Sequence, residues 1–444
     1  MERRLSRYLL YSQIQFVPMI RANTFQLAGE NQSRLFKWSI YILALLFFLN
    51  CFSPLRLHYD MLRYFAIKDC IEGKCPTGAD PHDYMPYGYT ALLLVLSKLG
   101  ILRSFSIICI NCIYLFCGLY FVRKIFNYIR SPYFLFFLVL LNWTVIKFVT
   151  HPLSELQYLF FSLASVYAFY LFTQQKKIIH LVLAFLLAGL AFVTRTVGVS
   201  LVAALLAALI WEYRKELIGL IKENKIAVFA IGICISIVLI FSRQLGLNHY
   251  TGVMTKQFNE GLRFRDVIQW HFSEWGEIFL NISKFKVISY LPGRVGGTLF
   301  LASGILGICG FIYICFIKKS RIPFVVKSYL FFYVLLLFNW PFPDPRFWVP
   351  IIPLVAAVIS QSSLSLKPPF RIIALSYLLI YTLLGLASIG FITYTSLNKK
   401  EFSKNQAGGV YRNEYETHFF GRPLSDTATH IDQNLVEFLN KYDR

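Results

Sequence analysis

Long apolar runs separated by short polar connections recur between residues 35 and 395 of this chain. A hydrocarbon layer ~30 Å thick requires about 20 mainly apolar residues of a helix that crosses it, and these runs reach about 16–22. The pattern predicts an all-α protein, a polytopic bundle of transmembrane helices with eleven spans, or twelve in a second version. The eleven expected spans are 35–52, 105–122, 132–149, 153–173, 178–194, 197–211, 226–242, 298–317, 324–340, 346–360 and 372–395.

The apolar segment Tyr89–Leu102 is short and is not counted among these spans. As a span it would place Arg123, Lys124 and Arg130 outside, whereas cytoplasmic loops normally carry the excess of Lys and Arg. We therefore interpret it as an interfacial or re-entrant helix. The short basic connections then all lie on the cytoplasmic side with the N-terminus, and the C-terminus lies outside.

The same assignment sets the expected domain boundaries. Residues 1–34 form a basic cytoplasmic tail, residues 35–395 the transmembrane domain, and residues 396–444 a short exterior tail. The larger exterior loops are 53–104 and 243–297.

Two exterior segments carry helical patterns of their own. WHFSEWGEIF, residues 270–279, is predicted to be an amphipathic helix lying on the surface. NLVEFLNKY, close to the C-terminus, is also predicted to be helical.

Composition agrees with a membrane protein and argues against a nucleic-acid-binding one. Hydrophobic residues make up 57% of the chain and charged residues 15%, too little charge for the surface of one large soluble core. The formal charge of +21 comes mainly from short connections and not from a compact basic domain, so we expect no nucleic-acid partner. We expect a multi-pass protein surrounded by membrane lipids, in a bacterial inner membrane in preference to an endoplasmic-reticulum membrane.

The first exterior loop holds most of the candidate chemistry. From Arg56 to Asp83 it carries four basic and five acidic residues in a chain that is otherwise poor in acids. Asp60, just past the first span, could act as a general base on an acceptor hydroxyl or amine, because its pKa is tunable near the lipid boundary. The simpler interpretation is a solvated acid or a helix cap.

His151 and Glu155 lie four residues apart where one expected span ends and the next begins. Glu155 is a candidate second acid facing the same cavity as Asp60, although the dipole of a helix N-terminus would also favour it. Two carboxylates and one histidine leave a divalent metal ion as an open alternative.

Three arginines are candidates for binding an anion. Arg195 interrupts a long apolar stretch, where a charge is costly unless it faces water or an anion. The alternative interpretation is that Arg195 marks a turn between two helices and extends its side chain to the membrane interface. Arg346 lies in a proline-rich turn and could bind a phosphate or carboxylate, or simply pair with Asp344. Arg294 lies in a Gly-rich approach to a span, which resembles an anion nest.

The cysteines do not form a zinc or redox set. Most lie inside the expected spans, whereas Cys70 and Cys75 lie in the first exterior loop and could form a small disulfide in an oxidising compartment. No P-loop or other Gly-rich nucleotide motif is present, so a cytosolic nucleotide substrate is not expected.

Taken in order, these motifs resemble the GT-C membrane glycosyltransferases, the superfamily of protein O-mannosyltransferases and bacterial aminoarabinose transferases. Asp60 is followed by Tyr64 and Ala66 in the first exterior loop, and Glu155 is a second exterior acid. The resemblance covers roughly residues 35–360, and the other similar stretches are YMPYGY before ALLLVL, LAGLAFVTRTVG and DPRFWVPIIPLV.

The resemblance implies a polyprenyl-phosphate sugar donor, an exterior glycan, lipid or protein acceptor, and inversion at the anomeric carbon. Asp60 would then be the catalytic base and Glu155 a second catalytic acid. The implied substrate contacts are Arg195, Arg346, His151, Arg294, Tyr64 and Tyr87. The chain departs from the family in having a single acid at Asp60 and His151-Pro152 where other members carry acids.

Two other classes of function remain open. A transporter or flippase of a polyprenyl-linked or anionic solute would also use intramembrane Arg and Glu, but it predicts inverted repeats that the chain does not show. A non-catalytic member of the family would keep the scaffold as an interaction protein.

Overall fold

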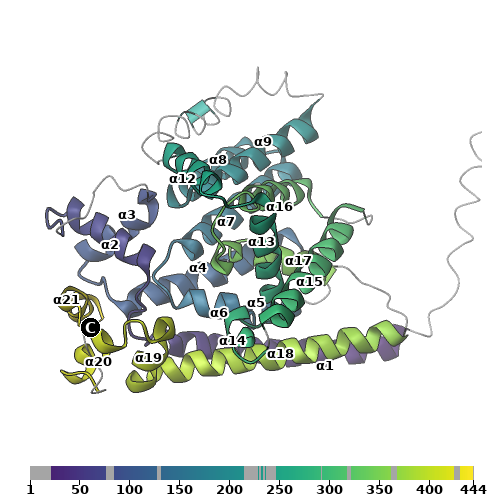
Figure 1. Cartoon of the computed structure of the whole chain (residues 1–444). Coiled ribbons are helices and arrows are strands. Elements are labelled where there is room, and N and C mark those ends of the chain that lie inside the picture. Colours follow the sequence, from purple (N-terminus) through teal and green to yellow (C-terminus); the bar gives the residue numbers. More distant parts are fainter. Residues whose placement is uncertain are drawn as a thin grey trace, which may run out of the picture.

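The computed structural model describes residues 22–76, 85–127, 132–214, 247–291, 293–317, 322–361, 368–424 and 431–443, with residues 229, 232–233 and 236. Within these ranges every regular element is a helix and none is a strand, which confirms the all-α prediction (Figure 1).

Five described helical segments are long and apolar enough to cross a membrane, and three shorter helices are also apolar. Together these eight coincide with eight of the expected spans. Most of the expected span 226–242 lies outside the described residues. The long segments are α4 (Ser104–Ile125), α7 (Glu155–Gln175), η1 (Thr196–Gly198) with α9 (Val199–Tyr213), α15 (Gly293–Ile312) with the π-turn η2 (Tyr313–Ile317), and α18 (Pro368–Leu397). The shorter ones belong to α1 (Ala22–Asn50), α8 (Ile178–Thr194) and α16 (Phe324–Leu337).

Two expected spans are not continuous helices. Residues 132–149 form α5 (Pro132–Leu140) and α6 (Trp143–Val149), because the Asn142 side chain accepts a hydrogen bond from Thr144 N at 3.2 Å and starts a new helix. Residues 346–360 form η3 (Pro345–Trp348) and α17 (Ile352–Gln361). At 1.5 Å per residue, a ten-residue helix spans only about 15 Å, half of a hydrocarbon layer.

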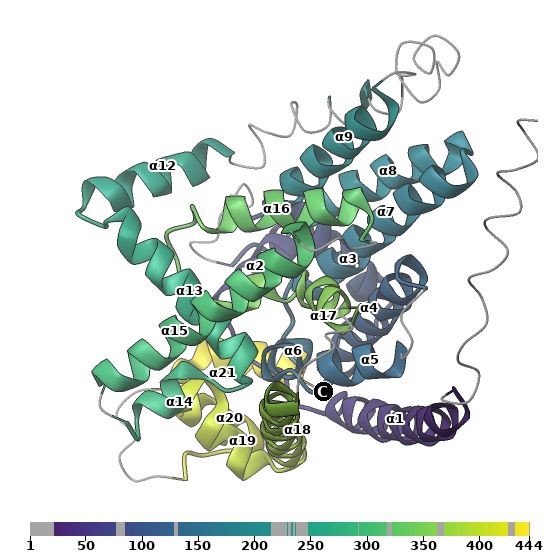
Figure 2. The same ribbon diagram turned by 90° about the vertical axis from the view of Figure 1, so that its right-hand side faces the viewer.

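The core of the bundle is built around α7, which lies between α4 and α8 and is buried along most of its length. On one side α9 packs against α16, and on another α13 (Phe264–Leu280) packs along α15. Figure 2 shows these pairs from the side.

α13 is a helix as predicted, but its expected position on the surface is wrong. Its residues His271, Glu274 and Trp275 are buried against the bundle. Contact with α15 is close because Gly276 lies against Phe300, where any side chain would collide with the Phe300 backbone. Along the chain, α12 (Leu247–Asn259) precedes α13 and α14 (Lys284–Ile288) follows it.

Residues 53–104, predicted to be the first exterior loop, contain two short helices, α2 (Tyr59–Ile71) and α3 (Tyr87–Lys98). The short apolar segment that was not counted as a span is therefore a helix, as predicted. Gly88 lets α3 approach the C-terminal end of α8, since a Cβ there would meet Val193 O and Thr194. A disulfide joins Cys70 and Cys75 at the end of α2.

The C-terminal tail docks on this loop. It forms α19 (Lys399–Asn405), η4 (Gln406–Gly409), α20 (Arg412–Phe420) and α21 (Gln433–Tyr442), the last of which contains the predicted NLVEFLNKY helix. The rings of Phe438 and Tyr442 lie 5.2 and 4.8 Å from that of Phe65 in α2. The tail helices therefore lie beside α2, at the lower left of Figure 1.

Candidate active site

A cavity of about 760 Å³ lies between α2, the N-terminus of α7, the α8–α9 junction, α12 and the turn after α16. This volume is in the range of small-molecule sites. Among the residues that the structure describes, four charged side chains line this cavity: Asp60, Glu155, Arg195 and Arg346. The rest of the wall is largely apolar and includes Leu153, Val197, Val199, Val253, Met254, Leu336, Leu337 and Phe342.

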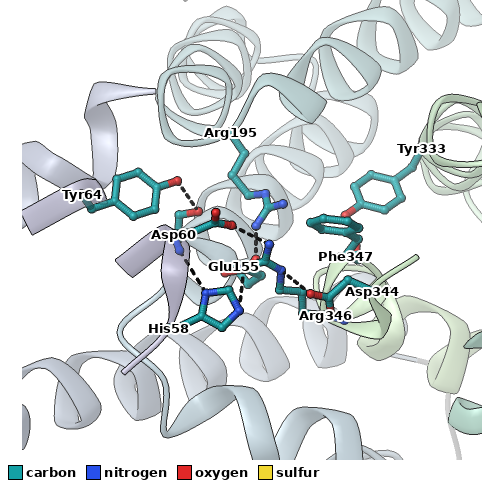
Figure 3. A network of polar contacts seen from close by, with 10 residues as sticks. His58, Asp60, Tyr64, Glu155, Arg195, Tyr333, Asp344, Arg346 and Phe347 are labelled. Carbon is teal, nitrogen blue, oxygen red and sulfur yellow. Dashed lines mark hydrogen bonds and ion pairs between the residues drawn. The ribbon is translucent and has the colours of Figure 1, made fainter. Parts of the chain in front are cut away.

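The four charged residues come from four separate parts of the chain and contact one another (Figure 3). Arg346 Nη2 lies 2.5 Å from Asp60 Oδ2. Arg195 pairs with Glu155 Oε1, and Arg346 Nε lies 3.6 Å from the same oxygen. Asp344 adds a third carboxylate, 2.9 Å from Arg346 Nε, so the pairing anticipated from the sequence is present together with the wider cluster.

One carboxylate oxygen of Glu155 does not take part in the ion pairs of this cluster. Glu155 is 1% exposed, and its Oε2 has no hydrogen-bond partner among the described residues. A buried acceptor without a partner is costly, and a bound molecule that donated a hydrogen bond would remove that cost. Glu155 also begins α7, so the helix-dipole explanation holds alongside this one.

Asp60 is held as a carboxylate. Burial raises the pKa of Asp60, but the charge and hydrogen bond of Arg346, with a smaller contribution from the charge of Arg195, outweigh burial and lower this pKa below its ordinary value. A carboxylate so stabilised is a weak base as long as Arg346 remains its partner.

His58 is a site residue that the sequence did not point to. It caps α2, and its Nδ1 accepts a hydrogen bond from Asp60 N at 3.2 Å. Burial and the charge of Arg346 lower the pKa of His58, so the ring is neutral, and its Nε2 lies 3.5 Å from Arg346 Nη1. Only its position two residues before Asp60 could have suggested it.

Tyr64 lies at the cavity as expected. Its hydroxyl is 3.0 Å from Ser154 Oγ, and its ring meets Tyr89 edge-on at 5.0 Å. On the opposite wall the Phe347 ring lies 5.3 Å from the Arg195 guanidinium and 4.9 Å from that of Arg346. Both guanidinium groups are within cation–π distance of the same ring, which helps to hold the two arginines in place.

Three predicted substrate contacts do not line the cavity. His151 is buried, with Nδ1 2.8 Å from Lys147 O, and burial lowers its pKa well below the ordinary value. Tyr87 lies half-buried on α3. Arg294 is exposed at the start of α15. Their spacing in the sequence could not show which face of each helix they occupy.

The tail holds the segment that leads into Asp60. The Tyr415 hydroxyl accepts a hydrogen bond from Leu57 N at 2.8 Å and donates one to Leu55 O at 2.7 Å. The buried Arg56 side chain reaches Gln406 Oε1 at 3.2 Å and Ser396 Oγ at 3.0 Å. The tail was expected only as an exterior extension, and its role in positioning this segment was missed.

Two buried polar side chains of α13 form hydrogen bonds with the turn from Trp340 to Trp348, which contains Arg346. Glu274 Oε2 accepts a hydrogen bond from Trp348 Nε1 at 2.6 Å and lies 2.8 Å from His271 Nδ1. His271 Nε2 in turn is 2.8 Å from Trp340 O. Both ends of the turn from Trp340 to Trp348 are therefore tied to one helix.

The chain has no match among protein-family models, curated proteins or solved structures. Within the described ranges, no three His, Cys, Asp or Glu side chains gather into a group that could hold a metal ion. Asp60 and Glu155 instead face arginines.

Proposed function

We propose that this protein is a membrane glycosyltransferase that moves a sugar from a polyprenyl-phosphate donor to an exterior acceptor. The observation that carries the proposal is the cluster of two arginines and two carboxylates at a largely apolar cavity. An amphiphilic substrate with a phosphate at the junction of its sugar and its lipid fits such a cavity, because the apolar walls accommodate the lipid and the arginines the phosphate.

In the proposed reaction, Asp60 accepts the proton of an acceptor hydroxyl. The acceptor oxygen attacks the anomeric carbon from the face opposite the phosphate, and the bond between that carbon and the phosphate oxygen breaks. The electron pair leaves with the polyprenyl phosphate, and the sugar is transferred with inversion. Arg195 and Arg346 neutralise the charge that develops on the leaving group.

Donor binding also adjusts the strength of the base. Arg346 pairs with Asp60 and lowers its pKa. A donor phosphate that takes over Arg346 weakens this effect, while burial continues to raise the pKa of Asp60. Asp60 thus becomes a stronger base when the donor is in place. Glu155 Oε2 is then available to accept a hydrogen bond from a sugar hydroxyl.

The test measures sugar transfer by the purified protein in proteoliposomes that contain a panel of polyprenyl-phosphate sugars, with total membrane glycans and lipids as acceptors. Asp60→Asn keeps the shape of the side chain but removes the base, and we expect transfer to fall by a factor of about 10²–10⁴. Asp266→Asn, which removes a carboxylate from an exposed ion pair on α13, is the control.

Transfer by Asp60→Asn at the wild-type rate would refute the assignment of the base. A transporter would move the intact donor across the bilayer without cleaving it. Recovery of the donor, unchanged, on the opposite side from wild-type protein would therefore favour the transporter over the transferase.

A further inference from the structure

Two aromatic side chains on the short segment between α13 and α15 are more exposed than any other large apolar side chain described. Tyr290 is 89% exposed and Phe285 is 85% exposed. Aromatic rings are costly to leave in water, and Tyr in particular is enriched at the level of lipid headgroups. Their exposure indicates a surface that something else covers.

Few acids lie near these rings, and the nearest one in the sequence, Glu277, is buried and interacts with Lys284. Lys284, Lys286 and Arg294 lie in the same stretch, and the sequence contains no Asp or Glu between Ile278 and Pro343. We call Lys284, Phe285, Lys286, Tyr290 and Arg294 the basic–aromatic collar. Its partner should therefore be anionic and should also accept aromatic rings.

The collar lies close to the ends of two candidate membrane spans. Arg294 is the first residue of a candidate span, and α14 contacts that helix. The Lys286 ammonium lies 4.5 Å from the ring of Phe391, near the C-terminal end of α18, a second candidate span. Figure 2 shows α14 beside α15, on the side toward α18. The collar thus lies where two apolar helices end.

We propose that the basic–aromatic collar binds the headgroups of anionic phospholipids, with Phe285 and Tyr290 in the interfacial layer and the three cations on lipid phosphates. This assigns Arg294 to the bilayer surface and not to the sugar cavity. The proposal stands independently of the glycosyltransferase proposal, because no collar residue lines the cavity.

The experiment titrates the purified protein in detergent with palmitoyl-oleoyl phosphatidylglycerol or phosphatidylcholine and counts bound lipids by native mass spectrometry. The test variant is Lys284→Gln, Lys286→Gln and Arg294→Gln combined. Each cation near an anionic surface contributes roughly fivefold in affinity, so we expect the triple variant to lose at least about tenfold for phosphatidylglycerol and little for phosphatidylcholine.

Two further variants make the result specific. The control combines Lys256→Gln, Arg263→Gln and Arg265→Gln, three exposed cations in a segment that also contains Glu260 and Asp266, and it should bind phosphatidylglycerol like wild type. A charge-preserving triple, Lys284→Arg, Lys286→Arg and Arg294→Lys, should retain binding. Equal losses in test and control variants, equal losses for both lipids, or no loss in the test variant would each overturn the proposal.

Discussion

Replacing Tyr415 by Phe tests whether the C-terminal tail holds the segment that carries Asp60. The side chain is fully buried, and its hydroxyl bonds two main-chain groups, Leu57 N and Leu55 O. Phe fills almost the same space, so the change removes the hydroxyl and leaves the packing. A buried main-chain group without a partner costs about 1–3 kcal/mol, and two such groups give a loss of about 2–6 kcal/mol in the free energy of unfolding.

The assay is amide hydrogen exchange in detergent, combined with denaturant unfolding. Because the Leu57 amide loses its acceptor, its exchange should quicken by at least about tenfold, even under conditions in which the variant remains folded. The same loosening should reduce sugar transfer, since His58 and Asp60 follow directly.

Tyr442→Phe is the matched control. Tyr442 is also a buried tyrosine of the tail, but its hydroxyl lies 3.0 Å from Asp69 Oδ1 and 2.9 Å from Lys68 Nζ, side chains of α2. This variant should lose stability without a selective change at Leu57. If Leu57 exchanged at the wild-type rate in Tyr415→Phe, or equally fast in both variants, the tail would not be a positioning element.

Two further predictions concern α13 and its C-terminal end. Burial raises the pKa of Glu277 to about 7 from an ordinary 4.5, so proton binding stabilises the folded state and this stability is lost as pH rises from 4.5 through 7. Glu277→Gln stays neutral at every pH, so we expect this variant to be more stable than wild type by up to about 3 kcal/mol at pH 8 and similar to it below pH ~4.5. Unfolding midpoints measured across this pH range provide the test. A stability difference that did not change with pH would contradict the prediction. Asn281 has φ 59°, and its side chain forms hydrogen bonds with Leu141 O, Tyr381 O and Trp143 N at 2.7–2.9 Å. We therefore expect Asn281→Ala to lower the free energy of unfolding by about 3 kcal/mol or more. An unfolding midpoint close to that of wild type would show that these hydrogen bonds contribute little.

The class of the fold could be predicted from the sequence because membrane helices must be long, apolar and internally hydrogen-bonded. Expected spans such as 178–194 and 372–395 match α8 and the apolar part of α18 within a few residues. An apolar run does not form one continuous helix where a single polar side chain competes with the helical hydrogen bonds. Asn142 is such a case, because one cap divides an apolar stretch that has no other break.

The site could be predicted only in part. Asp60, Glu155, Arg195 and Arg346 stand out because charge is rare in this chain and costly next to lipid, and the structure brings these four together. His151 and Arg294 are also polar residues next to apolar segments, but neither lines the cavity. His151 is buried in the protein, and Arg294 is exposed at the surface.

The amino-acid pattern by itself determined where the long apolar helices lie and which charged residues interrupt them, but it did not predict α2, α12, α19 or α20. Only the tertiary structure decided that α12 closes the cavity, that His271 and Glu274 support the Arg346 turn, and that Tyr415 fixes the approach to Asp60. These contacts join residues up to about 360 positions apart. Hydrophobic period and local charge describe one segment at a time, whereas such contacts depend on how separate helices pack.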